Sequence, residues 1–158
     1  MTKDILLYET GDGGDITIIA NDVALSETLY QQIYLALFGG NTEASTKGNE
    51  LETQNRFDYW ANDLFHDANK KRQFNSETEK VLKEVVLNSS GRLAIIDAVK
   101  KDLKFLDNIA NVNIQVSILA TDRLEILLQL SGLSNQEDRE YQLIWNNSKS
   151  ELIFENKV

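Results

Sequence analysis

The chain has 158 residues, of which 42% are apolar and 26% charged, and its net charge is −9. This is the size and composition of one ordinary globular domain, so residues 1–158 are predicted to form a single domain. The lack of cysteine excludes disulfides and thiolate metal sites, a single histidine excludes a histidine-rich metal site, and the acidic balance disfavours a nucleic-acid partner.

Two short apolar runs open the chain, ILLY at residues 5–8 and DITII at residues 15–19. The segment between them, TGDGG, is rich in glycine, which adopts positive φ at little cost, so the pattern predicts a β-hairpin. Its glycine spacing does not match a dinucleotide-binding loop, and its acids do not have the spacing of an EF-hand. A tight turn is therefore the main interpretation, and a cation bound at Asp12 and Asp15 is the alternative.

An amphipathic helix is predicted over residues 27–38. Ser26 is a suitable N-cap and Gly39 a suitable residue just beyond the C-terminus. The apolar face recurs at a spacing of four residues: Leu29, Ile33 and Leu37.

Residues 39–56 contain one large aliphatic residue and are predicted to form a long exposed polar loop. A dense aromatic cluster follows the loop. Two interpretations remain open for it, burial in the core or docking on a partner protein, because Trp and Tyr often anchor interfaces. The partner-binding candidates are Phe57, Tyr59, Trp60 and Phe65.

Two further helices are predicted. The first begins with a capping box from Ser76 to Glu79 and contains a supportive Glu79–Lys83 pair. The segment SSG at residues 89–91 is expected to interrupt, and the second helix to span residues 92–107. Its predicted apolar face consists of Leu93, Ile96, Val99, Leu103 and Leu106. Its predicted solvent face consists of Asp97, Lys100, Lys101 and Lys104.

From residue 112 the apolar period changes from that of a helix to that of a strand. Alternating runs occur at residues 112–118, 124–130 and 141–145, and a last short run at residues 151–155. This pattern predicts an antiparallel meander with one wet face and one buried face. The fold class is therefore α+β: an antiparallel β-sheet, formed by the N-terminal hairpin and the C-terminal meander, covered by about three amphipathic helices.

Catalytic chemistry has little support in the sequence. His66 lies near Asp63 and Asp67, but no motif supplies a nucleophile. Glu137 and Asp138 are interpreted as solvated charges in a loop. No apolar run reaches the roughly 18 residues that a membrane-spanning helix requires, and the acidic N-terminus argues against a signal peptide. We therefore expect no catalytic residues, metal, cofactor, small-molecule substrate or membrane partner.

Four segments together resemble a known family: DILLYETGDGGDITI at residues 4–18, LALFGG at 35–40, YWAN at 59–62 and REYQLIW at 139–145. In their order the chain is similar to the gene-product-forty-six family of Mu-type phage and prophage baseplates. The resemblance implies a structural protein of a contractile tail baseplate, assembled in the bacterial host cytoplasm, that binds other tail proteins and performs no catalysis.

Two alternatives stay open. The first is an acidic protein-binding module, similar to an inhibitor or immunity protein, in which the N-terminal acids Asp4, Asp12, Asp15 and Asp22 converge with C-terminal acids on one face. The second is an enzyme that uses carboxylates around His66.

Overall fold

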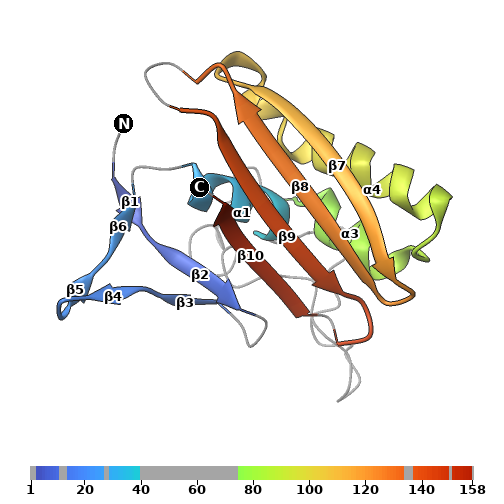
Figure 1. The fold of residues 1–158 in the computed structure, drawn as a ribbon, viewed down its shortest axis with the longest axis horizontal. Helices are drawn as coiled ribbons and strands as arrows, with labels where there is room; N and C mark the ends of the chain where they lie inside the picture. The colour runs from blue at the N-terminus through green and yellow to red at the C-terminus, as the bar shows by residue number, and fades with distance from the viewer. Residues whose placement is uncertain are drawn as a thin grey trace.

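A twisted antiparallel sheet and a layer of helices on one of its faces make up the body of the protein (Figure 1). The computed structural model describes residues 3–10, 14–26, 29–39, 75–133, 137–149 and 151–157. The α+β prediction is confirmed. The predicted turn at residues 11–13, the loop at residues 40–56, the aromatic candidates Phe57, Tyr59, Trp60 and Phe65, and His66 lie outside the described residues.

The main sheet has six strands in the order β3-β2-β10-β9-β8-β7. The four C-terminal strands form the predicted meander: β7 (Asn111–Ala120), β8 (Arg123–Ser131), β9 (Arg139–Asn146) and β10 (Glu151–Lys157). The N-terminal strand β2 (Leu7–Thr10) pairs antiparallel with β10, and β3 (Gly14–Ile16) pairs with β2. The predicted pairing of the two N-terminal runs is therefore confirmed, and it extends the sheet beyond the meander.

One face of this sheet supplies ten of the buried apolar residues of the core. The alternation predicted from the sequence places successive side chains on opposite faces, and the cross-strand partners keep the buried residues on one side. The buried strand residues are Val116, Leu124, Ile126, Leu128, Leu130, Tyr141, Leu143, Trp145, Leu152 and Phe154. On the other face, polar side chains bridge strands: Asn113 donates to Gln129, and Gln129 donates to Glu140.

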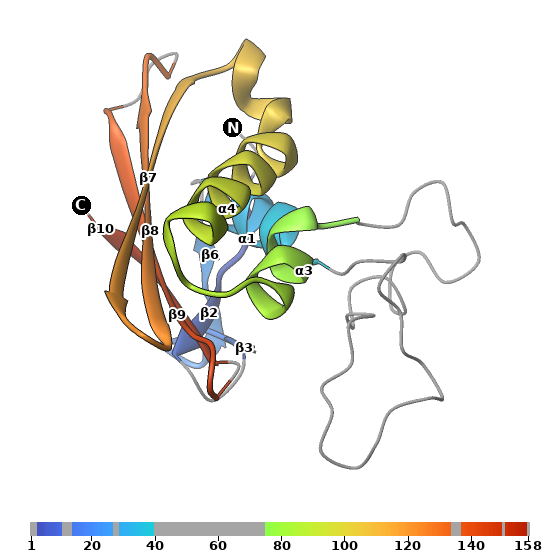
Figure 2. The ribbon, with the colours of Figure 1, turned by 90° about the vertical axis from the view of Figure 1, so that its right-hand side faces the viewer.

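The helix layer covers the buried face of the sheet (Figure 2). It consists of α1 (Tyr30–Phe38), α3 (Glu77–Glu84), α4 (Ser89–Asp102) and the 3₁₀ helix η1 (Lys104–Asn108). The aromatic ring of Tyr30 stacks on Phe154 at 4.4 Å, and its hydroxyl donates to the Phe154 carbonyl over 2.7 Å. None of the described helices is long and apolar enough to cross a membrane.

The predicted start of α1 is wrong, whereas its predicted last residue, Phe38, is confirmed. The helix begins at Tyr30 with Leu29 as N-cap, because Ser26 pairs with Asp4 in a short strand and is not available for capping. Gly39 is itself the C-cap and has a right-handed φ of −78°. Its N–H donates to the Ser76 hydroxyl over 3.2 Å, so this helix end is tied to the start of α3.

The prediction for the last helix is also partly wrong. The segment SSG does not separate the two helices but forms the first turn of α4. The Asn88 side chain caps this turn, because its oxygen accepts the Gly91 N–H over 2.9 Å. The α-helix ends at Asp102, and the expected continuation is the 3₁₀ helix. Val99, Leu103 and Leu106 are buried as predicted, whereas Leu93 is 57% exposed. The predicted solvent face is confirmed, since Asp97, Lys100, Lys101 and Lys104 are exposed.

Core packing predicts a large difference between two leucines. Leu128 is fully buried in β8, whereas Leu25 is 57% exposed. We expect Leu128→Ala to lower the free energy of unfolding by about 2–5 kcal/mol, because it removes buried methyl groups and leaves a cavity. The matched change Leu25→Ala should cost well under that amount. Urea denaturation of both variants measures the difference, and equal losses would contradict the assignment of the core.

Candidate functional site

The N-terminal arm is the first candidate site. It comprises two short two-stranded ribbons: β1 (Asp4–Ile5) with β6 (Leu25–Ser26), and β4 (Ile18–Ile19) with β5 (Asp22–Val23). Figure 1 shows the arm, in blue, projecting beyond the edge of the main sheet. Strand β2 continues from β1 and connects the arm to that sheet.

A closed cycle of backbone hydrogen bonds holds the arm together. Leu6 N–H donates to Ala24 C=O over 2.8 Å, Ala24 N–H donates to Thr17 C=O over 2.8 Å, and Thr17 N–H donates to Leu6 C=O over 2.9 Å. Each of these three residues lies between two strands: Leu6 between β1 and β2, Thr17 between β3 and β4, and Ala24 between β5 and β6. The two strands on either side of each residue pair with different partners. The predicted strand at residues 15–19 is therefore divided at Thr17, between β3 and β4.

A tight turn closes the ribbon of β4 and β5. Ala20 and Asn21 both have positive φ, 52° and 63°, which is the requirement of a two-residue type I′ hairpin turn. Asn adopts this conformation readily. The sequence IIANDV contains this signal, and it could have located the second hairpin.

The arm exposes large apolar side chains in unusual density. Ile5 lies opposite Leu25, and Ile18 lies opposite Val23, so each ribbon presents a cross-strand apolar pair. A two-stranded ribbon has no second layer to bury such pairs, and contiguous exposed apolar surface is typical of interaction sites. Six residues of the arm and its junction with the sheet are between 40% and 62% exposed: Ile5, Ile16, Ile18, Ile19, Val23 and Leu25.

The N-terminal acids occupy separate parts of the arm. Asp4 lies on β1, where its carboxylate accepts the N–H of Ile5, and Asp22 lies on β5, where it accepts the N–H of Val23. Both residues are exposed. Asp12 and the side chain of Asp15 lie outside the described residues, so the alternative cation site stays a prediction.

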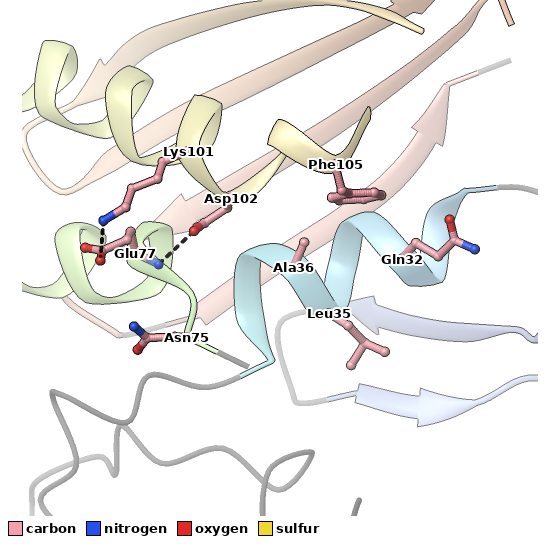
Figure 3. A pocket seen from close by; sticks show the side chains of 8 residues that line it. All are labelled: Gln32, Leu35, Ala36, Asn75, Glu77, Lys101, Asp102 and Phe105. Carbon is pink, nitrogen blue, oxygen red and sulfur yellow. Dashed lines mark hydrogen bonds and ion pairs between the residues drawn. The ribbon is translucent and has the colours of Figure 1, made fainter. Parts of the chain in front are cut away.

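The second candidate is a groove in the helix layer (Figure 3). It has a volume of about 690 Å³ and opens between α1, the start of α3, the end of α4 and the 3₁₀ helix. Leu35, Ala36 and Phe105 give it an apolar lining. Its polar lining consists of Gln32, Asn75, Glu77, Lys101 and Asp102.

Asp102 is the most constrained polar residue of this groove. Its two carboxylate oxygens accept the backbone N–H groups of Glu77, over 3.0 Å, and Thr78, over 2.7 Å. It thus caps the N-terminus of α3 from another helix, whereas the predicted cap, Ser76, makes no capping hydrogen bond with its side chain. Burial raises the pKa of Asp102, and the hydrogen bonds from Thr78 and Glu77 act in the opposite direction.

An ion pair adds a second tie between the same helices. Lys101 Nζ lies 2.7 Å from Glu77 Oε1 at the rim of the groove. The polar groups at this end of the groove therefore hold α3 against α4 (Figure 3). What the groove offers a ligand is its apolar lining beside Phe105, which is 43% exposed.

Glu79 is a buried carboxyl behind the groove wall. It is 2% exposed and lies 3.1 Å from Lys83 Nζ, which confirms the predicted pair within α3. Burial raises the pKa of Glu79 to about 7, although Lys83 acts to lower it. Its second oxygen, Oε2, has no hydrogen-bond partner within the part of the chain that the structure describes.

The remaining sequence candidates give no catalytic arrangement in the described segments. Glu137 and Asp138 are exposed, in agreement with solvated charges. Among the residues with described positions, no cluster of three or more His, Asp or Glu side chains could hold a metal ion. Local sequence patterns predicted neither the arm nor the capping role of Asp102.

Comparisons with protein-family models, with curated proteins and with solved structures found no match to this chain. Function is therefore inferred from the surfaces described above and from the resemblance in the sequence. Of these surfaces, the arm exposes the most apolar side chains, and the groove combines an apolar lining with groups already engaged in holding helices.

The Asp102 cap predicts a stability effect. We expect Asp102→Ala to lower the free energy of unfolding by about 1–3 kcal/mol, because two helix N–H groups lose a charged acceptor. The matched control is Asp97→Ala, an exposed change in the same helix that should stay within about 0.5 kcal/mol. Urea denaturation at neutral pH compares the two, and a neutral effect of Asp102→Ala would remove the proposed capping role.

Glu79 predicts a pH dependence of stability. Its pKa is higher in the folded protein than its ordinary value of 4.5, so the folded state binds the proton more tightly. The contribution of the Glu79 carboxyl to the free energy of unfolding is complete below pH 4.5 and is lost as the pH rises through about 7. Its full size is roughly 3 kcal/mol.

The measurement is the free energy of unfolding from pH 4 to pH 9, taken as the difference between the protein and Glu79→Gln. The difference should change over this window, because the variant cannot titrate. Glu84→Gln, an exposed change in the same helix, should leave the pH profile as it is. A parallel profile for Glu79→Gln would show that this carboxyl is not perturbed.

Proposed function

We propose that this protein is a structural component of a contractile phage or prophage tail baseplate and that it acts by protein–protein assembly, without catalysis. The observation that carries the proposal is the N-terminal arm, with its exposed apolar pairs on ribbons that no second layer covers within the described part of the chain. Apolar surface of this kind gains stability when a partner covers it.

The expected gain is large enough to drive assembly. Full burial of one Ile, Val or Leu side chain contributes about 1.5–3 kcal/mol. Ile18 and Val23 lie side by side on one ribbon, and Ile5 and Leu25 on the other, so a partner can cover two side chains at each position. The arm is fastened by backbone hydrogen bonds, so its ordering is in place before docking.

The resemblance supports the particular assembly. Of the four segments that carry it, three lie at least partly in described elements: residues 4–10 and 14–18 belong to the arm and the N-terminal hairpin, residues 35–39 end α1, and REYQLIW is most of β9. The fourth segment, YWAN, lies outside the described residues. On this proposal the protein resides in the virion baseplate after assembly in the host cytoplasm, and its partners are other tail proteins.

The arm predicts a loss of binding on polar substitution. The test is co-purification with the tail subunits encoded beside its gene. We expect the double change Ile18→Ser and Val23→Ser to weaken capture roughly tenfold or more, because the partner then covers polar side chains. The unfolding midpoint should change less than for a core substitution, since Ile18 is 61% and Val23 40% exposed.

The matched control is Val86→Ser, at an apolar residue that is 74% exposed outside the arm. This variant should bind as the unaltered protein does. Capture that is insensitive to the double change would contradict docking through the arm, and a gene neighbourhood without tail proteins would contradict the baseplate assignment.

A further inference from the structure

We propose that the outer edge of β7 is a self-association site, at which β7 of one copy pairs antiparallel with β7 of a second copy and the two sheets become continuous. This inference goes beyond the proposed function and rests on a different part of the molecule. The arm lies beyond the β3 side of the sheet, whereas β7 is at the opposite edge (Figure 1).

The composition of β7 is unusual for a sheet edge. Its ten residues, NVNIQVSILA, contain no charged residue and no proline. Natural edge strands are commonly short or protected by charges, proline or bulges, because unpaired N–H and C=O groups otherwise recruit another strand. The edge at β3 follows that rule, since it has three residues and includes Asp15. The only irregularity of β7 lies at its end, between Ile118 and Ala120.

No described strand pairs with the outer side of β7. Apolar side chains are also exposed near its C-terminal end, Ile118 at 38% and Leu119 at 52%. Leu93 belongs to the same region. Helix α4 is connected to β7 by the short 3₁₀ helix and packs against β7, with the two elements running in opposite directions.

The strand is complementary to itself in one antiparallel register. With Gln115 opposite Gln115 of the second copy, Ile114 faces Val116 and Val112 faces Ile118 on the helix side of the sheet. On the open side, Asn113 faces Ser117. Apolar residues therefore meet apolar residues, and polar residues meet polar ones, as the period of two requires. A two-fold axis through Gln115 relates the copies.

Charge favours this occupant over contact elsewhere on the surface. The chain carries a net charge of −9, so two copies repel one another on average. The β7 edge contributes no charge to such a contact. An uncharged, β-branched strand without proline is also prone to aggregation when it is left open. Pairing within a closed dimer covers it without leaving a new edge at that position.

The test uses the mass of the whole chain in solution as a function of concentration, measured by analytical ultracentrifugation. We expect a dimer, and we expect Gln115→Lys to raise its dissociation constant by roughly tenfold or more, because it places two like charges opposite each other at the axis. The matched control, Gln32→Lys, introduces the same charge at an exposed site on α1 and should leave the dimer intact.

The register is tested separately, because the chain has no cysteine of its own. Gln115→Cys should form a disulfide-linked dimer under mild oxidation, whereas Gln32→Cys should not. A mass of one chain at every concentration overturns the proposal, as does a dimer that Gln115→Lys leaves unchanged. Unfolding midpoints measured at a concentration at which the chain is a monomer should be the same for the variants and the unaltered protein, which separates an effect on association from one on folding.

Discussion

The contact between α1 and β10 at Phe154 is the interaction on which the rest of the structure depends. The Phe154 ring stacks on Tyr30, and its carbonyl accepts the Tyr30 hydroxyl. The same residue lies opposite Leu143 in β9 and Glu9 in β2. It therefore joins the helix layer, the C-terminal meander and the N-terminal segment. Because β2 leads directly into the arm, the position of the arm is set from this buried point.

The two surfaces assigned to association lie at opposite edges of one sheet (Figure 1). A partner on the arm and a second copy on β7 do not compete for the same strands. Such a protein joins neighbours on two sides while its buried face stays closed beneath the helices. This arrangement suits an assembly component, and it makes the two associations separable by mutation.

Sequence periodicity predicted the parts of the fold in which many residues repeat one pattern. The meander is confirmed because its strands of seven to ten residues alternate clearly between a wet and a buried face. The arm could not be predicted in the same way, because its strands have two residues each and no period can be read from two positions. Its junction depends on hydrogen bonds among three separate segments.

The predictions of the helix caps were wrong for a related reason. Ser76 has the local pattern of a capping residue, but the acceptor for the α3 N–H groups is Asp102, 24 and 25 residues further along the chain. Local capping signals describe only neighbours in sequence, whereas tertiary packing brought a stronger, charged acceptor to the same helix end. The exposed Leu93 is a further case, because its spacing fits the apolar face but the side chain is 57% exposed.

The manner in which α3 is held explains why the groove and the titrating carboxyls occur together. This helix buries Thr78, Glu79 and Leu82, so only one of its buried residues is a large apolar one, whereas α1 buries Tyr30, Ile33, Tyr34, Leu37 and Phe38. Apolar packing alone therefore fixes α3 weakly, and polar ties to its neighbours supply the rest. Burial raises the pKa of Asp102, which makes one of these ties, and of Glu79, which pairs with Lys83 within α3. One of the buried carboxyls, Asp102, therefore lines the groove and also holds its wall, while the surfaces proposed for association depend on backbone pairing and apolar contact.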